Sequence, residues 1–180
     1  MILVALFAFL LFFSYARANT PYLSFSQSKK TYSDINLRFS FKYPKDFEVR
    51  KTKADKITYI DIYPALYKDK FEPKFIEIIV MPSQSNAPLG EIILDSFPDK
   101  SKRDIIRLIK NNADGVQINE RSNINENSQL SYFRYGQKLY IVKFNKSYYD
   151  PKNPFVLVNN SLFEGTYLGI INSISFTPSR

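Results

Sequence analysis

The sequence predicts an α+β fold, in which helices flank an antiparallel sheet. Apolar and polar residues alternate from Leu37 to Tyr43, with the period of a half-buried strand. Residues 75–81 are apolar except for Glu77, which is typical of a central strand covered on both faces. From Leu89 the apolar spacing lengthens to that of a helix, so helices are available to cover the sheet.

The first half of the chain is expected to contain four strands. Pro44 ends the first strand, because proline cannot donate to a ladder, and a turn at 44–46 leads into a returning strand at 47–49. Residues 56–63 alternate again, with Thr58, Ile60 and Ile62 on one face. The run at 75–81 is the fourth strand.

Two helices are expected in the middle of the chain. An apolar stripe at helical spacing predicts a helix over residues 89–97, which begins after Pro88 and stops at Pro98. Residues 101–104 resemble a capping box and predict a second helix, which ends in the segment from Asn111 to Gly115. The apolar stripe of this second helix would consist of Ile105, Leu108 and Ile109.

The last third predicts a hairpin, a helix and a closing strand. Residues 130–135 and 138–144 read as two strands around a tight turn at Gly136. Residues 145–160 are rich in Asn and Pro and are expected to form a long loop. Apolar residues between 162 and 171 suit a short helix, and residues 173–176 suit a final strand.

Residues 1–18 are interpreted as a signal peptide, so the protein is expected to be exported, either periplasmic or secreted. Residues 1–13 are almost wholly apolar, and Ala16 and Ala18 have the small side chains that signal cleavage requires. The apolar run is shorter than the roughly 20 residues that cross a bilayer. The alternative is a membrane anchor formed by residues 2–13. Residues 19–36 are then a polar leader, and residues 37–177 form a single domain.

Composition excludes several classes of protein. The chain of 180 residues contains no cysteine, which excludes a scaffold held by disulfides. It also contains no histidine, which excludes a Ser-His-Asp triad, a histidine general base and a His-ligated zinc site. No cofactor is expected. The formal charge of +8 suits an anionic partner, either a protein or a component of the cell envelope.

Three segments resemble motifs of the PsbP-like family. Residues 37–47 are similar to its opening motif, residues 136–144 to its hairpin strand, and residues 170–176 to its closing motif. Phe47 stands where the family usually has Trp, and Ile174 where it usually has Phe. The resemblance implies an α/β/α sandwich, with no enzymatic activity in most members. The alternative fold is a cone-shaped α+β roll, in which a curved sheet wraps around a helix.

Two groups of residues are candidates for function. Asp61 and Glu77 lie in apolar strands, and such paired carboxylates could serve as acid and nucleophile in a hydrolase. The densest basic cluster lies in a predicted hairpin, where it could bind a partner, and it consists of Arg50, Lys51, Lys53 and Lys56. Basic and aromatic residues do not interleave regularly there, so nucleic acid is not favoured as the partner.

These observations favour an exported, non-enzymatic binding or accessory module of the cell envelope or extracellular space. Two alternatives stay open. The first is an envelope hydrolase that uses carboxylates such as Asp61 and Glu77. The second is a secreted effector that binds a host protein through its basic surface.

Overall fold

The computed structural model describes residues 27–65, 75–83, 85–96, 105–110, 113–118, 128–145 and 160–178. Within these ranges the chain forms two antiparallel sheets and two helices, which confirms the α+β class. The expected signal peptide at 1–18, the first part of the leader and most of the 145–160 loop lie outside the described residues.

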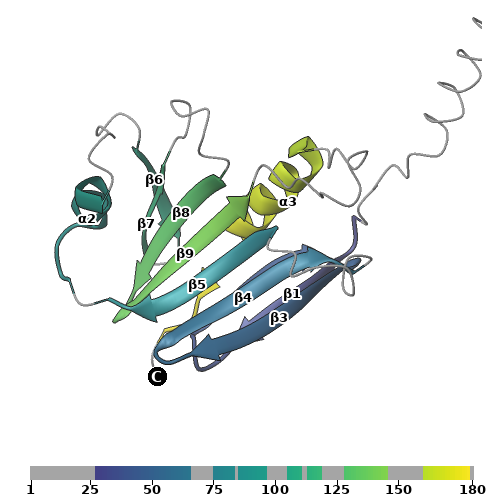
Figure 1. Cartoon of the computed structure of the whole chain (residues 1–180), viewed down its shortest axis with the longest axis horizontal. Helices are drawn as coiled ribbons and strands as arrows, with labels where there is room; N and C mark the ends of the chain where they lie inside the picture. Colours follow the sequence, from purple (N-terminus) through teal and green to yellow (C-terminus); the bar gives the residue numbers. More distant parts are fainter. Residues whose placement is uncertain are drawn as a thin grey trace, which may run out of the picture.

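The larger sheet has seven strands in the order β3-β4-β5-β9-β8-β7-β6 (Figure 1). Their bounds, in that order, are Phe47–Ala54, Ile57–Pro64, Ile76–Pro82, Lys138–Asn145, Ser128–Tyr135, Ala113–Ile118 and Ile105–Lys110. All neighbouring strands are antiparallel. The predicted central strand, β5, lies between β4 and β9. It pairs with β9 along its full length, from Ile76 to Pro82.

The smaller sheet contains β1 (Lys29–Asp34), β2 (Phe39–Pro44) and β10 (Ser175–Phe176), with β2 in the middle. β1 lies in the segment that we expected to be a polar leader, so the sheet begins before Leu37. Five of its six residues are exposed or half-buried. Its apolar signal is therefore weak, and backbone pairing with β2 holds it in place.

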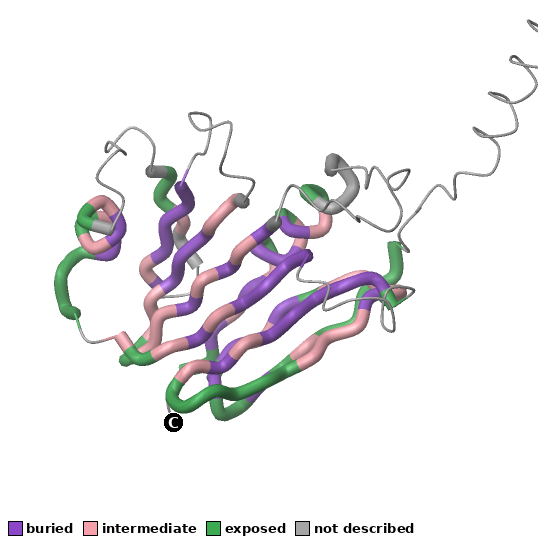
Figure 2. Tube along the Cα trace, viewed as in Figure 1, coloured by how far each residue is buried: buried purple, intermediate pink, exposed green. Residues whose placement is uncertain are grey.

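The main core lies between the two sheets. The inner face of the large sheet includes three fully buried residues that lie opposite one another on β4, β5 and β9, namely Ile60, Ile78 and Val142. Phe39 and Phe41 of β2 pack against this face, and Phe41 is 1% exposed, which confirms the predicted strand face. Figure 2 shows this buried layer along the central strands.

Helices cover both faces of the large sheet, as predicted. α3 (Asn160–Ser173) lies beside β2 on the inner face, where Tyr167 and Ile170 are buried. α2 (Leu89–Ser96) lies on the outer face, where Leu89 and Ile93 pack against β7 and β8. Neither helix in the described chain is long and apolar enough to cross a membrane.

The predicted helix that begins at residue 101 is wrong. Residues 105–110 and 113–118 form the hairpin β6–β7 at the edge of the large sheet. Isoleucines at 105, 106 and 109 favour a strand, because their branched side chains are restricted in a helix. Gly115 does not end a helix. It lies in β7, where a Cβ atom would come within 2.7 Å of the Phe133 ring.

The predicted hairpin around Gly136 is confirmed. β8 and β9 pair from Ser128–Asn145 to Tyr135–Lys138, which leaves a two-residue turn. Gly136 has a φ of 58°, in the left-handed region that glycine enters without a steric penalty. This turn brings Lys138 and Tyr140 to one end of the sheet, where the candidate site lies.

Candidate functional site

A pocket of about 570 Å³ lies where three turns meet at one end of the sandwich. The turns connect β1 to β2, β3 to β4 and β8 to β9, and the end of β5 completes the wall. We call it the three-turn pocket, and it is lined by Asn36, Leu37, Arg38, Lys56, Thr58, Val80, Met81, Pro82, Tyr135, Gly136, Gln137, Lys138 and Tyr140.

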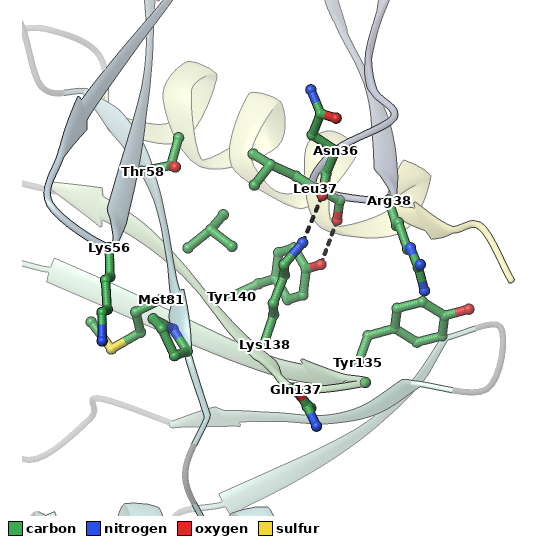
Figure 3. Close-up of a pocket in the computed structure, with 13 residues that line it drawn as sticks. Asn36, Leu37, Arg38, Lys56, Thr58, Met81, Tyr135, Gln137, Lys138 and Tyr140 are labelled. Atoms are coloured by element: carbon green, nitrogen blue, oxygen red, sulfur yellow. Dashed lines mark hydrogen bonds between the residues drawn. The ribbon is translucent and has the colours of Figure 1, made fainter. Parts of the chain in front are cut away.

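Every charged residue that lines the three-turn pocket is a cation. Arg38 and Lys56 come from two turns and Lys138 from the start of β9, and the described lining residues include no Asp or Glu. Figure 3 shows Lys56 on one side, beside Met81, and Arg38 and Lys138 on the other side. Cations of one sign around a concave surface focus a positive potential, which attracts anions.

A buried carboxylate braces the turn that forms one wall of the pocket. Asp34 Oδ1 accepts hydrogen bonds of 3.0 Å from the backbone N–H groups of Asn36 and Leu37. Its Oδ2 accepts a 2.5 Å bond from Lys51 Nζ and a 3.2 Å bond from the Tyr32 hydroxyl. Burial alone would raise the pKa of Asp34, but the bonds from Lys51 and Leu37 outweigh burial and hold it below its ordinary value.

Strand β9 of the β8–β9 hairpin also holds the β1–β2 turn, through two side-chain hydrogen bonds. Lys138 Nζ donates a 2.6 Å hydrogen bond to the carbonyl of Asn36, and the Tyr140 hydroxyl donates a 2.5 Å bond to the carbonyl of Leu37 (Figure 3). Burial is the main cause that raises the pKa of Tyr140 to about 12. These contacts fix Arg38 at a φ of 55°, a conformation that costs about 1–2 kcal/mol for a residue with a Cβ atom.

The structure divides the predicted basic cluster. Strand alternation places Arg50 on the outer face of β3 and Lys51 and Lys53 on the inner face. Arg50 forms a 3.1 Å ion pair with Asp61, whereas Lys51 pairs with Asp34 and so joins the two sheets. Lys53 is exposed on the edge strand. Of the four predicted residues, Lys56 alone lines the three-turn pocket.

Sequence reasoning missed Arg38 and Lys138 as site residues. Both lie inside segments that resemble structural motifs, where they appear as the polar positions of alternating strands. They are 100 residues apart along the chain by their numbers (138 − 38), and only the packing of β2 against β9 brings them to one pocket. Ile35, at the tip of the same β1–β2 turn, is 88% exposed.

The two candidate carboxylates face each other across β4 and β5. Asp61 and Glu77 are 3% and 5% exposed, and Asp61 Oδ2 accepts both hydrogen bonds that Arg50 donates to it. Neither residue lines the three-turn pocket. Within the described ranges, no three potential ligands among Asp, Glu, His and Cys gather as a metal site would require.

Among solved structures, this chain is similar to a cyanobacterial PsbP. The solution structure of cyanobacterial PsbP (CyanoP) from Synechocystis sp. PCC 6803 superposes with a TM-score of 0.42 at 13% sequence identity. The match covers 86% of this chain and 95% of that chain. No protein-family model matches the sequence, and no curated protein matches it. The fold class therefore rests on the strands and helices of the chain itself.

Proposed function

We propose that this protein is an exported, non-enzymatic binding module that holds an anionic group of its partner in the three-turn pocket. The observation that carries this proposal is the lining of the pocket, in which the described residues include three cations, two from turns and one from the start of β9, and no carboxylate. Arg50 and Lys51, by contrast, each lie beside a carboxylate.

The pocket is also held in shape before any ligand arrives. Asp34, Lys138 and Tyr140 fix the β1–β2 turn through hydrogen bonds to its backbone. A binding surface that is already ordered loses less conformational entropy on association. Lys138 uses one N–H group on Asn36, and an ammonium has three, so the residue can bind the turn and an anion together.

The lining favours binding over catalysis. A general base needs a pKa near the working pH, and the lining residues include no carboxylate, histidine or thiol. Tyr140, with a pKa of about 12, stays protonated at neutral pH. The hydrolase alternative requires a substrate to reach Asp61 and Glu77, which are buried. The effector alternative requires exposed lysines of β3 such as Lys53, and so differs in location from the pocket.

Titration with simple anions tests the binding site. Phosphate and acetate should shift the backbone amide resonances of residues 35–38, 56 and 136–138 of isotopically labelled protein. A double variant, Arg38→Gln with Lys56→Gln, should lose these shifts. The matched control is Lys42→Gln with Lys53→Gln, which removes the same charge from exposed positions away from the pocket. Equal behaviour of the two double variants would contradict a localised site.

Export is tested separately by sequencing the amino terminus of the protein after expression in its host. If residues 1–18 are a cleaved signal, the chain recovered outside the cytoplasm should begin at Asn19. Membrane-bound protein that still begins at Met1 would support the anchor instead.

A further inference from the structure

We infer that the ligand of the three-turn pocket is an aliphatic carboxylate, with its anionic head at the cationic rim and its chain along an apolar floor. This inference rests on the proposed function and adds the apolar half of the ligand. The simplest form of such a ligand is a free fatty acid of medium chain length.

The floor of the pocket is apolar. Leu37 and Val80 are 8% and 3% exposed, and Met81 and Pro82 continue this surface along the end of β5. Tyr140 also lines the pocket, but it is 1% exposed and its hydroxyl is bonded to the Leu37 carbonyl. Met81 and Pro82 form the part of this surface that is open to water, and a hydrocarbon chain would bury it.

The size of the pocket also favours a ligand with a body. Its volume of about 570 Å³ lies within the range of sites that hold drug-sized molecules, roughly 300–1,000 Å³. A single phosphate or acetate ion would fill a small part of it. Figure 3 shows Lys56 beside Met81 on one side of the pocket and Lys138 beside Tyr140 on the other.

The aromatic residues of the pocket favour an aliphatic chain over a nucleobase. Tyr135 stacks on Phe176, with ring centroids 5.0 Å apart and planes inclined by 27°. The Tyr140 ring packs between Phe39 and Phe176, at centroid distances of 5.3 Å and 5.0 Å. Because Tyr140 is buried and Tyr135 already stacks on Phe176, the two rings do not form the open stacking platform that base recognition uses.

A series of carboxylates tests the inference by calorimetric titration of the full exported chain. Acetate, butanoate, hexanoate and octanoate share one head and differ in chain length. Each added methylene should tighten binding about fourfold, because burying a methylene contributes about 0.8 kcal/mol. 1-Octanol and octyltrimethylammonium should bind at least tenfold more weakly than octanoate, because they lack the negative charge.

Two variants separate the head from the chain. Met81→Gln keeps the shape of the side chain but makes it polar, and should reduce the gain per methylene. Arg38→Gln should weaken every carboxylate by a similar factor. The control is Leu168→Gln, since Leu168 is an apolar residue of α3 that is 40% exposed and lies outside the pocket. This control should leave the whole series unchanged.

Several outcomes would overturn the inference. Equal affinity for acetate and octanoate at the pocket would refute the apolar half and leave the proposed function standing. Octanol binding as tightly as octanoate would refute recognition of the head. Binding to vesicles of anionic phospholipid without binding to free octanoate would assign the site to a membrane surface. If no anion binds, the proposed function fails as well.

Discussion

The cations of β3 and the cations of the three-turn pocket look alike in sequence but differ in what faces them. Arg50 and Lys51 each contact a carboxylate whose side chain is almost buried, Asp61 at 4% and Asp34 at 8%. Arg38, Lys56 and Lys138 line a pocket in which the described residues include no carboxylate. The first pair holds strands and sheets together, and the second group is available to a ligand. The group that lies beside each cation in space, and not the density of charge along the chain, separates the two roles.

This difference changes how the predicted basic cluster should be tested. Replacing Arg50, Lys51, Lys53 and Lys56 together would remove a docking surface only if all four were exposed and unpaired. Two of them neutralise buried carboxylates, and a buried group that loses its partner costs about 1–3 kcal/mol. The fourfold variant would therefore report on folding as well as on binding.

The largest effect is expected at Asp34, which pairs with Lys51 of β3 and also accepts hydrogen bonds from Tyr32 and from the β1–β2 turn. Asp34→Ala should lower the free energy of unfolding by about 3 kcal/mol, because two backbone N–H groups and Lys51 lose their acceptor. Urea denaturation at pH 7 measures this change. The pKa of Asp34 is depressed in the folded state, so its contribution is present above its ordinary pKa of 3.8 and is lost as pH falls through the lowered value.

The difference between wild type and Asp34→Ala should accordingly shrink in acid. A difference that stays constant down to pH 2 would show that the charge of Asp34 does not contribute. A loss of less than 1 kcal/mol at pH 7 would show that Lys138 and Tyr140 hold the turn without it.

A smaller effect is expected for the cation of the same pair. Lys51→Met should cost about 1–3 kcal/mol, because the buried Asp34 carboxylate loses its partner while the methionine keeps most of the apolar stem. Lys53→Met is the matched control, since Lys53 is exposed on the same strand and face as Lys51 but forms no ion pair within the described residues. It should change stability by less than about 0.5 kcal/mol. Equal losses of stability for the two variants would show that the ion pair with Asp34 does not distinguish Lys51 from Lys53.

Alkaline titration should reveal the tyrosine beneath the pocket. The pKa of Tyr140 is raised to about 12, so the stability that it contributes is complete below its ordinary pKa of 10 and is lost as pH rises toward 12. Tyr140→Phe should cost about 1 kcal/mol at pH 7, through loss of the bond to Leu37. It should also flatten the fall in melting temperature between pH 10 and pH 12. An unchanged slope would assign that fall to other groups, including Tyr32, whose pKa is also raised.

The smallest effect on stability is expected in the pocket itself. Lys56→Gln should change the free energy of unfolding by less than about 0.5 kcal/mol, because Lys56 is exposed. The same variant should weaken octanoate binding. Chemical denaturation and calorimetric titration on one preparation measure both quantities. A destabilisation as large as that of Lys51→Met would place Lys56 among the paired cations.

Periodicity located most of the elements, and its failures have physical reasons. The strands around Phe41, Ile60 and Ile78 are buried on one or both faces, so their apolar spacing is strong. The hairpin β6–β7 was mistaken for a helix because apolar residues at 105, 106, 108 and 109 fit either period. β1 escaped notice because it is a mostly exposed edge strand, which backbone hydrogen bonds define more than side-chain burial does.

By itself the sequence determined the α+β class, the faces of the central strands, the glycine turn at 136 and the absence of histidine and cysteine chemistry. Those features depend on local spacing and on residue type, which the chain carries without folding. Only the tertiary structure decided which cations meet and which are neutralised. Strand alternation sends Arg50 and Lys51 to opposite faces, and packing of the small sheet against the large sheet brings Arg38 to the pocket that Lys56 and Lys138 line. Charge acts through distance in space, and distance in space is set by packing between sheets.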